Sequence, residues 1–335
     1  MAANATEIRL ALPSKGLLTE AALELLESAG LGVYHPNPRQ YKAVIPSLPS
    51  VTVIFQRPGD IVVSVRDGGV DFGVTGWDQV AERQGADGKV IPIHPALGFG
   101  ACTLNVIVPE AWETTERMAD LHGRQSELGR PLRVATKFPH VSAAFFRKNG
   151  LEGTEFIDAE GTLEIAPTIG YADLITDLVS TGTTLRDNRL KKLQDGQILA
   201  SQAVLIANKH SLKTDPAALG VARTLLEYIV AHLRAKDNVS IFANMRGDSA
   251  ESIAQRMFTQ SVIGGLQGPT LSPVITRQGE RWYAANLIVR KDQLSQAIAE
   301  LRQVGGSGVV VTPVIYIFEE EPVEYQNMLK NLAED

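Results

Sequence analysis

The residues best suited to chemistry form a run of hydroxyl side chains around one glycine, directly after the apolar segment 172–179. A glycine lets the backbone bend sharply and lets an anion come close to main-chain N–H groups. A helix that begins after such a loop adds oriented N–H groups and a favourable dipole. The pattern predicts a cradle for a phosphomonoester. Its residues are Ser180, Thr181, Gly182, Thr183 and Thr184.

The surroundings of this loop leave two interpretations open. Asp177 precedes the loop, where its carboxylate could accept hydrogen bonds from sugar hydroxyls beside a phosphate. No lysine follows Gly182, which excludes the Gly-Lys-Ser/Thr loop of many nucleoside triphosphatases. The alternative is that the hydroxyl side chains only cap the start of a helix. Composition alone favours neither interpretation over the other.

Three further turns follow apolar segments in the first third of the chain. They contain Lys15 and Gly16, then Arg57, then Gly76 and Asp78. The two cationic side chains could neutralise a phosphate or pyrophosphate, the arginine in a bidentate manner. Taken alone, the Lys15 turn is better interpreted as an ordinary turn with a solvated lysine, and the Arg57 turn could be a β-turn with proline at its second position. If the preceding strands are parallel, however, the turns meet at one sheet edge, where open α/β sheets bind ligands.

Two more charged candidates lie in the middle of the chain. Lys137 precedes a predicted helix and follows a short strand, so it could also face an anion. Glu164 stands in apolar surroundings within segment 161–170, which is expected to contain a helix. Its carboxylate could hold a ligand hydroxyl or a base edge, or simply complement a helix dipole. His140 is interpreted as a helix-start residue rather than a base.

The elements that must position these residues are short strands alternating with helices, which predicts an α/β architecture with largely parallel sheets. We expect two such lobes with a cleft between them, a periplasmic-binding-protein-like body. A long helix at 216–236 leads to a β-α-β-β-α-β order, which predicts a ferredoxin-like α+β domain. The expected domains are 1–102 with 190–237, then 103–189, then 238–335.

Composition narrows the class of protein. With 335 residues, 44% of them hydrophobic, the chain can bury a sizeable core in two or three domains. Its net charge of −6 argues against nonspecific binding to nucleic acid or to a membrane surface. The single cysteine, Cys102, excludes an intramolecular disulfide and is expected to be a buried structural thiol. The histidines are scattered without the spacing of metal ligands. Because the start of the chain is polar and no segment is long and apolar, we expect a soluble, cytoplasmic protein.

Taken in order, the motifs resemble those of the ATP phosphoribosyltransferase family, the enzymes that begin histidine biosynthesis. The last motif is the most specific, because it is similar to the family's loop for phosphoribosyl diphosphate (PRPP). The C-terminal part resembles the regulatory domain of the family's long form, through residues 268–273 and 308–313. The six motifs of the catalytic part are residues 10–16, 57–61, 73–78, 133–139, 160–167 and 177–185.

The resemblance implies a reaction in which N1 of the adenine of ATP attacks C1 of the PRPP ribose and pyrophosphate leaves. Residues 180–184 would hold the 5-phosphate, and Asp177 would hold the ribose hydroxyls. Arg57 and Lys15 would face the pyrophosphate, and Glu164 would contact the ribose or the adenine. Mg²⁺ would bridge pyrophosphate oxygens with few direct protein ligands. The remaining cleft residues would be Gly16, Gly76, Asp78 and Lys137.

The resemblance also implies regulation and assembly. Histidine would inhibit the enzyme at the C-terminal domain, with Thr270 and Ser307 as candidate contacts, and AMP is a further candidate effector. The family implies homo-oligomers, from dimers to hexamers. By likeness to the long form, the chain would need no separate partner subunit for catalysis.

Two departures from the family pattern stand out. Leu17 occupies a position where the family often has arginine, and residues 110–131 and 245–262 differ from the usual pattern. Two other classes of protein would share some of these features. One is a two-lobed binding protein that senses an anionic ligand without catalysis, and the other is an enzyme of another phosphoribosyl-transfer class. The order of the motifs before the loop favours the ATP phosphoribosyltransferase family over both.

Overall fold

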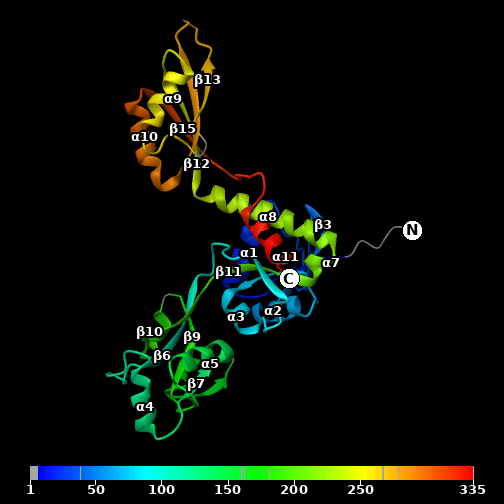
Figure 1. Cartoon of the computed structure of the whole chain (residues 1–335), viewed down its shortest axis with the longest axis vertical. Helices are drawn as coiled ribbons and strands as arrows, with labels where there is room; N and C mark the ends of the chain where they lie inside the picture. Colours follow the sequence, from blue (N-terminus) through cyan, green and yellow to red (C-terminus); the bar gives the residue numbers. More distant parts are fainter. Residues whose placement is uncertain are drawn as a thin grey trace, which may run out of the picture. The chain divides into compact units, whose positions relative to one another are not determined.

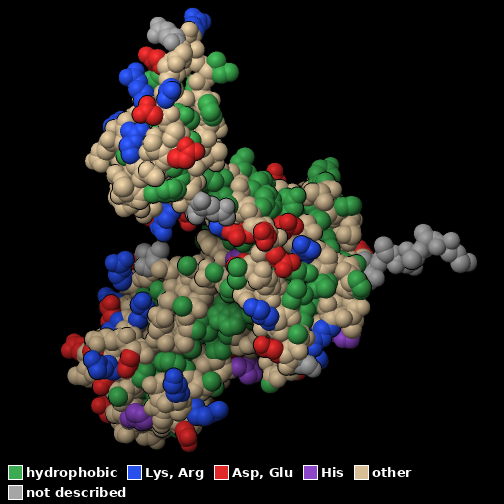
Figure 2. Space-filling model, turned by 45° about the horizontal axis from the view of Figure 1, so that its top comes forward, with side chains coloured by type: hydrophobic (Ala, Val, Ile, Leu, Met, Phe, Trp, Pro, Cys, Tyr) green, Lys and Arg blue, Asp and Glu red, His purple; other side chains and the backbone are tan. Residues whose placement is uncertain are grey.

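The computed structural model describes residues 7–37, 39–159, 161, 163–180, 182–265, 268–277 and 279–334. The chain divides into two compact units. The larger unit comprises Met1–Glu27, Leu31–Thr224 and Val323–Asp335, and the smaller comprises Ser28–Gly30 and Leu225–Pro322. Acidic and basic side chains are interspersed over the face shown in Figure 2, as the near-balanced charge count leads one to expect. Within the described residues, no helix is long and apolar enough to cross a membrane.

The first lobe of the larger unit is built on a six-stranded sheet in the order β2-β3-β1-β4-β11-β5. Its central strands β3, β1 and β4 are parallel neighbours, and β11 and β5 continue the sheet in antiparallel fashion. The strands are β1 (Ile8–Pro13), β2 (Lys42–Ile45), β3 (Leu48–Gln56), β4 (Phe72–Gly76), β5 (Val90–His94) and β11 (Ala203–Asn208).

Helices α1 (Leu17–Ser28), α2 (Pro58–Arg66) and α3 (Trp77–Arg83) follow β1, β3 and β4 respectively. Three side chains of α2, Ile61, Val62 and Val65, are fully buried and pack with Val80 of α3 against the sheet. Because each helix begins directly after a parallel strand, the turns that join them all lie at the same edge of the sheet. Helices α7 (Lys209–Thr214) and α11 (Val323–Ala333) complete this lobe.

The second lobe contains a five-stranded sheet in the order β10-β6-β9-β7-β8. Strand β7 runs parallel to both β8 and β9, whereas β6 is antiparallel to β9 and β10. Leu and Val side chains with Phe146 form its core. Its elements are β6 (Cys102–Pro109), α4 (Asp120–Leu128), β7 (Arg133–Thr136), α5 (Pro139–Lys148), β8 (Glu155–Asp158), β9 (Leu174–Val179), α6 (Thr183–Asp187) and β10 (Leu190–Ser201).

The structure differs from the sequence-based expectations at three places in this unit. Residues 190–201, expected with the first lobe, form β10 in the second sheet, because they pair with β6. The expected helix at 161–170 is a single 3-10 turn, Leu163–Ile165. Residues 323–333, expected with the C-terminal domain, form α11 in the larger unit, where Tyr325 and Met328 are buried.

Helix α8 (Pro216–Lys236) leads into the smaller unit, as expected. There an antiparallel sheet has the order β13-β14-β12-β15, and helices α9 and α10 cover one face (Figure 1). This β-α-β-β-α-β order confirms the ferredoxin-like prediction. The elements are β12 (Asn238–Arg246), α9 (Ala250–Phe258), β13 (Thr270–Val274), β14 (Trp282–Arg290), α10 (Leu294–Gln303) and β15 (Gly306–Pro313).

Asp173 anchors the start of β9, the strand that leads to the hydroxyl-rich loop. Arg130 donates two hydrogen bonds of 2.7 Å to its carboxylate, and the Arg133 N–H donates a third of 2.8 Å. Burial alone would raise the pKa of this carboxyl, but the guanidinium and the N–H outweigh burial, so the pKa is lowered. A lowered pKa in the folded state stabilises the protein above the ordinary aspartate pKa, and the stabilisation disappears as the pH falls.

We expect Asp173→Ala to lower the free energy of unfolding by about 2 kcal/mol at neutral pH, because a charge-assisted bidentate contact is lost. Urea unfolding would measure this, and the difference from wild type should shrink on acidification. Asp87→Ala is the control, because Asp87 pairs with Lys89 at the exposed surface. Equal stability of the Asp173 variant and the wild type at pH 7 would contradict the prediction.

Candidate active site

The turns at the carboxyl edge of the first sheet lie next to one another, as expected for parallel strands. β1 pairs in register with both β3 and β4, and the Ser14 N–H donates a 2.8 Å hydrogen bond to the Gln56 carbonyl. Gly16 has φ +82°, a conformation that favours glycine. The side chains of Lys15 and Arg57 are exposed and, within the described residues, make no ion pair or hydrogen bond. They are available to an anion at this edge.

Asp78, predicted to line the cleft, is instead buried in the packing of its own turn. The Ser201 hydroxyl donates a 2.6 Å hydrogen bond to its carboxylate, and Gln79 donates another of 2.7 Å. A Cβ atom on Gly76 would lie 2.3 Å from the Asp78 Oδ1, so a larger residue there would displace this hydrogen-bonded carboxylate. Cys102 is half-buried rather than fully buried. Burial and the nearby Asp78 raise the pKa of its thiol, which argues against a nucleophilic role.

The second sheet brings together three of the predicted site residues at its own carboxyl edge. Asp177 lies in β9, and its Oδ1 accepts a 2.8 Å hydrogen bond from the Leu178 N–H. Burial raises the pKa of the Asp177 carboxyl; that N–H and Lys137 act in the opposite direction, and Glu164 adds to the rise. The three charged groups are therefore close enough to influence one another.

The loop after Asp177 contains the left-handed backbone conformation that glycine favours. Gly182 has φ +73° and directly precedes α6. The side chains of Ser180 and Thr184 are exposed, as an anion-binding loop requires. Thr181 and the side chain of Thr183 lie outside the described residues.

Three buried hydroxyl groups connect β7, which ends just before Lys137, to β9, which contains Asp177. The Thr176 hydroxyl donates a 2.6 Å hydrogen bond to the Thr136 hydroxyl, and the Ser142 hydroxyl lies 2.8 Å from that of Thr176. The Thr136 hydroxyl also accepts a 2.9 Å hydrogen bond from the Phe138 N–H. Since none of the three hydroxyl residues is exposed, this series of hydrogen bonds holds β7, β9 and the start of α5 in one arrangement.

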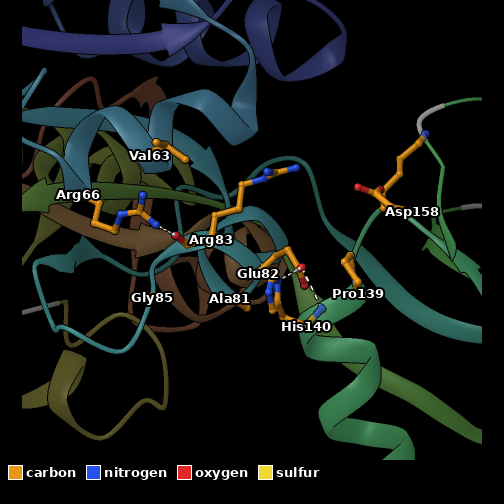
Figure 3. A pocket seen from close by; sticks show the side chains of 10 residues that line it. Val63, Arg66, Ala81, Glu82, Arg83, Gly85, Pro139, His140 and Asp158 are labelled. Carbon is orange, nitrogen blue, oxygen red and sulfur yellow. Dashed lines mark hydrogen bonds and ion pairs between the residues drawn. The ribbon is translucent and has the colours of Figure 1, made fainter. Parts of the chain in front are cut away.

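A cavity of about 530 Å³ lies between the two lobes of the larger unit (Figure 3). Arg83 from α3 and Asp158 from the end of β8 face this space in the figure. Three cationic side chains and two carboxylates line it, together with one histidine, which suits a polar, charged ligand. These residues are Arg66, Glu82, Arg83, Lys137, His140 and Asp158.

Only Lys137 among these residues was singled out from the sequence as a cleft residue. His140 was interpreted as a helix-start residue, and it does begin α5, but its ring also lies 2.7 Å from the Glu82 carboxylate. Glu82 lies four residues after Asp78, one helical turn further along α3. This spacing from a predicted site residue is the sequence signal that could have pointed to Glu82. The spacing could not reveal that the last turn of α3 faces the second lobe.

Thr270 and Ser307, the candidate histidine contacts, lie on opposite edge strands of the smaller unit's sheet. Thr270 in β13 pairs with Asn286 of β14, and Ser307 in β15 pairs with Asn244 of β12. Both side chains are exposed. Three strand spacings, roughly 14 Å, separate the two edges. The structure therefore does not bring these two residues into one site within a single chain.

Comparison with known proteins agrees with this architecture. A protein-family model described as ATP phosphoribosyltransferase (HisG) matches residues 57–235, and its C-terminal domain model matches residues 235–316. The Arabidopsis thaliana protein named ATP phosphoribosyltransferase 2, chloroplastic, is 43% identical over 98% of this chain and 81% of its own length. An ATP phosphoribosyltransferase of Nitrobacter hamburgensis is 32% identical over 93% of this chain and 94% of its own length.

A solved structure of the ATP phosphoribosyl transferase (HisG:HisZ) complex from Thermotoga maritima has the same fold. It matches with a TM-score of 0.52 and 24% identity over 67% of this chain and 98% of the matched chain. The family models and the curated relatives place the chain among the phosphoribosyltransferases, enzymes that transfer a pentose phosphate. Within that class it belongs to the ATP phosphoribosyltransferase family of histidine biosynthesis, in the long form with the C-terminal domain.

Proposed function

We propose that this chain transfers the 5-phosphoribosyl group of PRPP to N1 of ATP, releases pyrophosphate and forms N1-(5-phosphoribosyl)-ATP. The observation that supports this most directly is the placement of Asp177 and Gly182. A carboxylate and a positive-φ glycine loop follow one another at the carboxyl end of β9, beside Lys137. Together they offer acceptors for ribose hydroxyls and donors for a phosphate.

In this proposal the N1 lone pair forms the new bond to C1 of the ribose while the bond from C1 to the pyrophosphate oxygen breaks. Pyrophosphate leaves with the bonding electrons, so no strong general acid is needed. Lys15 and Arg57 neutralise the leaving group, residues 180–184 hold the 5-phosphate, and Glu164 contacts the ribose or adenine region. Positioning and charge neutralisation then supply most of the catalysis.

Magnesium fits this site as an ion held mainly by the substrate. In the part of the chain that the structure describes, no three acidic, histidine or cysteine side chains form a metal-binding group. Mg²⁺ often binds through substrate phosphates with one or two carboxylates. Asp177 and Glu164 are the carboxylates beside the loop that could contribute. When bound, the ion would neutralise charge on the pyrophosphate.

We further propose that histidine inhibits the enzyme through the smaller unit and that Thr270 contacts it. Because Thr270 and Ser307 lie on opposite edges of the sheet, a site that contains both requires two copies of the chain. We therefore propose a homo-oligomer, from dimer to hexamer, as the regulated form. AMP remains a candidate effector of the catalytic body.

Pyrophosphate release with purified protein, ATP, PRPP and magnesium, with and without histidine, tests the whole proposal. Release that depends on both substrates and falls with histidine would support catalysis and regulation together. Release insensitive to histidine would leave the reaction and remove the inhibitor site. No release, with ligand binding retained, would favour a two-lobed binding protein.

The backbone of Gly182 yields a separate prediction. We expect Gly182→Ala to raise the KM for PRPP about fivefold, because φ +73° is strained for residues with a Cβ atom. A Cβ atom there would have Val179 at 3.8 Å, so the effect comes from the backbone and not from a clash. Initial-rate kinetics would measure it, with Gly123→Ala in α4, where a Cβ meets open space, as the control. An unchanged KM for PRPP would argue against a role of this backbone conformation.

A further inference from the structure

Glu82 is a carboxylate of the first lobe that is bound by the main chain of the second lobe. Its side chain is only 3% exposed, at the end of α3. The His140 N–H donates a 3.0 Å hydrogen bond to its Oε1, and the Val141 N–H donates one of 3.0 Å to its Oε2. The His140 Nδ1 also lies 2.7 Å from Oε1 (Figure 3). All these partners belong to the first turn of α5.

This contact supplies what α5 lacks in its own lobe. The first N–H groups of a helix have no partner within the helix, and a polar N-cap side chain usually accepts from them. The N-cap of α5 is Phe138, which makes no such bond. Glu82 replaces it from more than fifty residues away in the sequence, and its negative charge suits the dipole of the helix start. The start of α5 is therefore capped only while the two lobes are in contact.

The capped turn also forms one wall of the interlobe cavity. Lys137 lies two residues before α5, and the buried hydroxyl groups of Thr136, Ser142 and Thr176 join this turn to the strand of Asp177. Glu82, His140 and Lys137 all line the cavity. The contact between Glu82 and α5 therefore joins the two lobes at the cavity wall that Lys137 also lines.

We propose that Glu82 is a positioning residue that holds the two lobes closed before substrate binds and thereby sets Lys137 at the cavity wall. This inference rests on the proposed function for its kinetic consequence only. A protein whose binding-competent state is only partly populated binds its ligand more weakly by that fraction. Loss of the cap should therefore raise the KM for PRPP, whereas saturating substrate should restore closure and leave kcat nearly unchanged.

Two variants remove the contact from opposite sides. Glu82→Gln keeps the shape but leaves one of the two N–H donors facing an amide NH₂ group. Val141→Pro removes a donor from the second lobe, and proline is tolerated in a first helical turn because that N–H has no intrahelical partner. Arg147→Ala is the matched control, because Arg147 is exposed in the last turn of α5 and does not line the cavity.

Lobe closure can be measured without turnover. In a Cys102→Ser background, Glu24→Cys in α1 and Glu152→Cys in the second lobe place two dyes at exposed positions, one on each lobe. We expect Glu82→Gln and Val141→Pro each to lower the energy-transfer efficiency of the substrate-free protein and to raise the KM for PRPP three- to tenfold. The double variant should do no worse than the stronger single variant, because both remove one contact. Arg147→Ala should stay within twofold of wild type in KM.

Unchanged energy transfer and KM in both single variants would overturn the proposal, as would single effects that multiply in the double variant. A purely structural role predicts a lower melting temperature with unchanged KM, and this result would overturn it too. If Glu82→Gln fails to fold, Val141→Pro decides by the same two measurements. If wild type releases no pyrophosphate, the proposed function fails, whereas energy transfer still decides whether Glu82 holds the lobes closed.

Discussion

Asp177→Asn is expected to lower kcat/KM for PRPP at least about 100-fold while the protein stays folded. Asparagine can still accept the hydrogen bond from the Leu178 N–H, so β9 should be unaffected. It cannot provide the negative charge that strengthens hydrogen bonds from two ribose hydroxyls, each worth about 1.5–3 kcal/mol. Pyrophosphate release at varied PRPP concentration would measure the loss. Asp187→Asn, at an exposed position of α6, is the control.

The raised pKa of Asp177 adds two observations that separate a catalytic from a structural role. Because burial raises its pKa in the folded state, this carboxyl stabilises the protein when protonated, and the stabilisation is lost as the pH rises through that pKa. Asparagine should therefore leave the melting temperature at pH 7 equal to or above that of wild type. The acid limb of kcat/KM in wild type should lie at higher pH than an ordinary aspartate would give. Normal PRPP binding and rate in the variant would refute the assignment.

Thr270→Ala is expected to raise the histidine concentration for half-inhibition at least about tenfold and to leave activity without histidine unchanged. The exposed hydroxyl of Thr270 lies in the smaller unit, whereas the catalytic candidates all lie in the larger unit. Losing one hydrogen bond to a charged ligand corresponds to a shift of this size. Initial rates across a histidine titration would measure it.

Ser272→Ala is the matched control for Thr270, because it removes a hydroxyl on the same face of β13 two residues away. Its inhibition curve should match that of wild type. Ser307→Ala tests whether the opposite edge strand takes part, which it can do only through a second copy of the chain. An unchanged inhibition curve for Thr270→Ala would remove this residue from the histidine site.

Local sequence signals predicted most of the fold because they are short-range. Apolar runs closed by glycine or proline turns marked the central strands, and helix α8 was expected at the residues where it lies. Four strands were not located in advance: β2, β5, β10 and β13. β10 has a mixed polar and apolar pattern broken by register shifts, so its place beside β6 depends on long-range pairing. β13, the short edge strand of the smaller unit, was likewise not located in advance.

The candidate site divides in the same way. Motif types and their order in the sequence already indicated the family, the hydroxyl-rich loop and Asp177, because these features lie within one strand and its following turn. Only the tertiary structure decided which side chains meet. The Asp78 carboxylate accepts a hydrogen bond from Ser201 of β10 and is buried. Thr270 and Ser307 lie on edge strands with two other strands between them.

Glu82 shows why such pairings cannot be read from one sequence. Its spacing from Asp78 places it one turn further along α3, but nothing local indicates that the end of this helix faces α5. That contact depends on how the two sheets of the larger unit come together, which is set by the summed packing of residues far apart in the chain. The sequence by itself thus determined the elements, the family and the loop chemistry. The tertiary structure decided the burial, the partners of each carboxylate and the contact between the lobes.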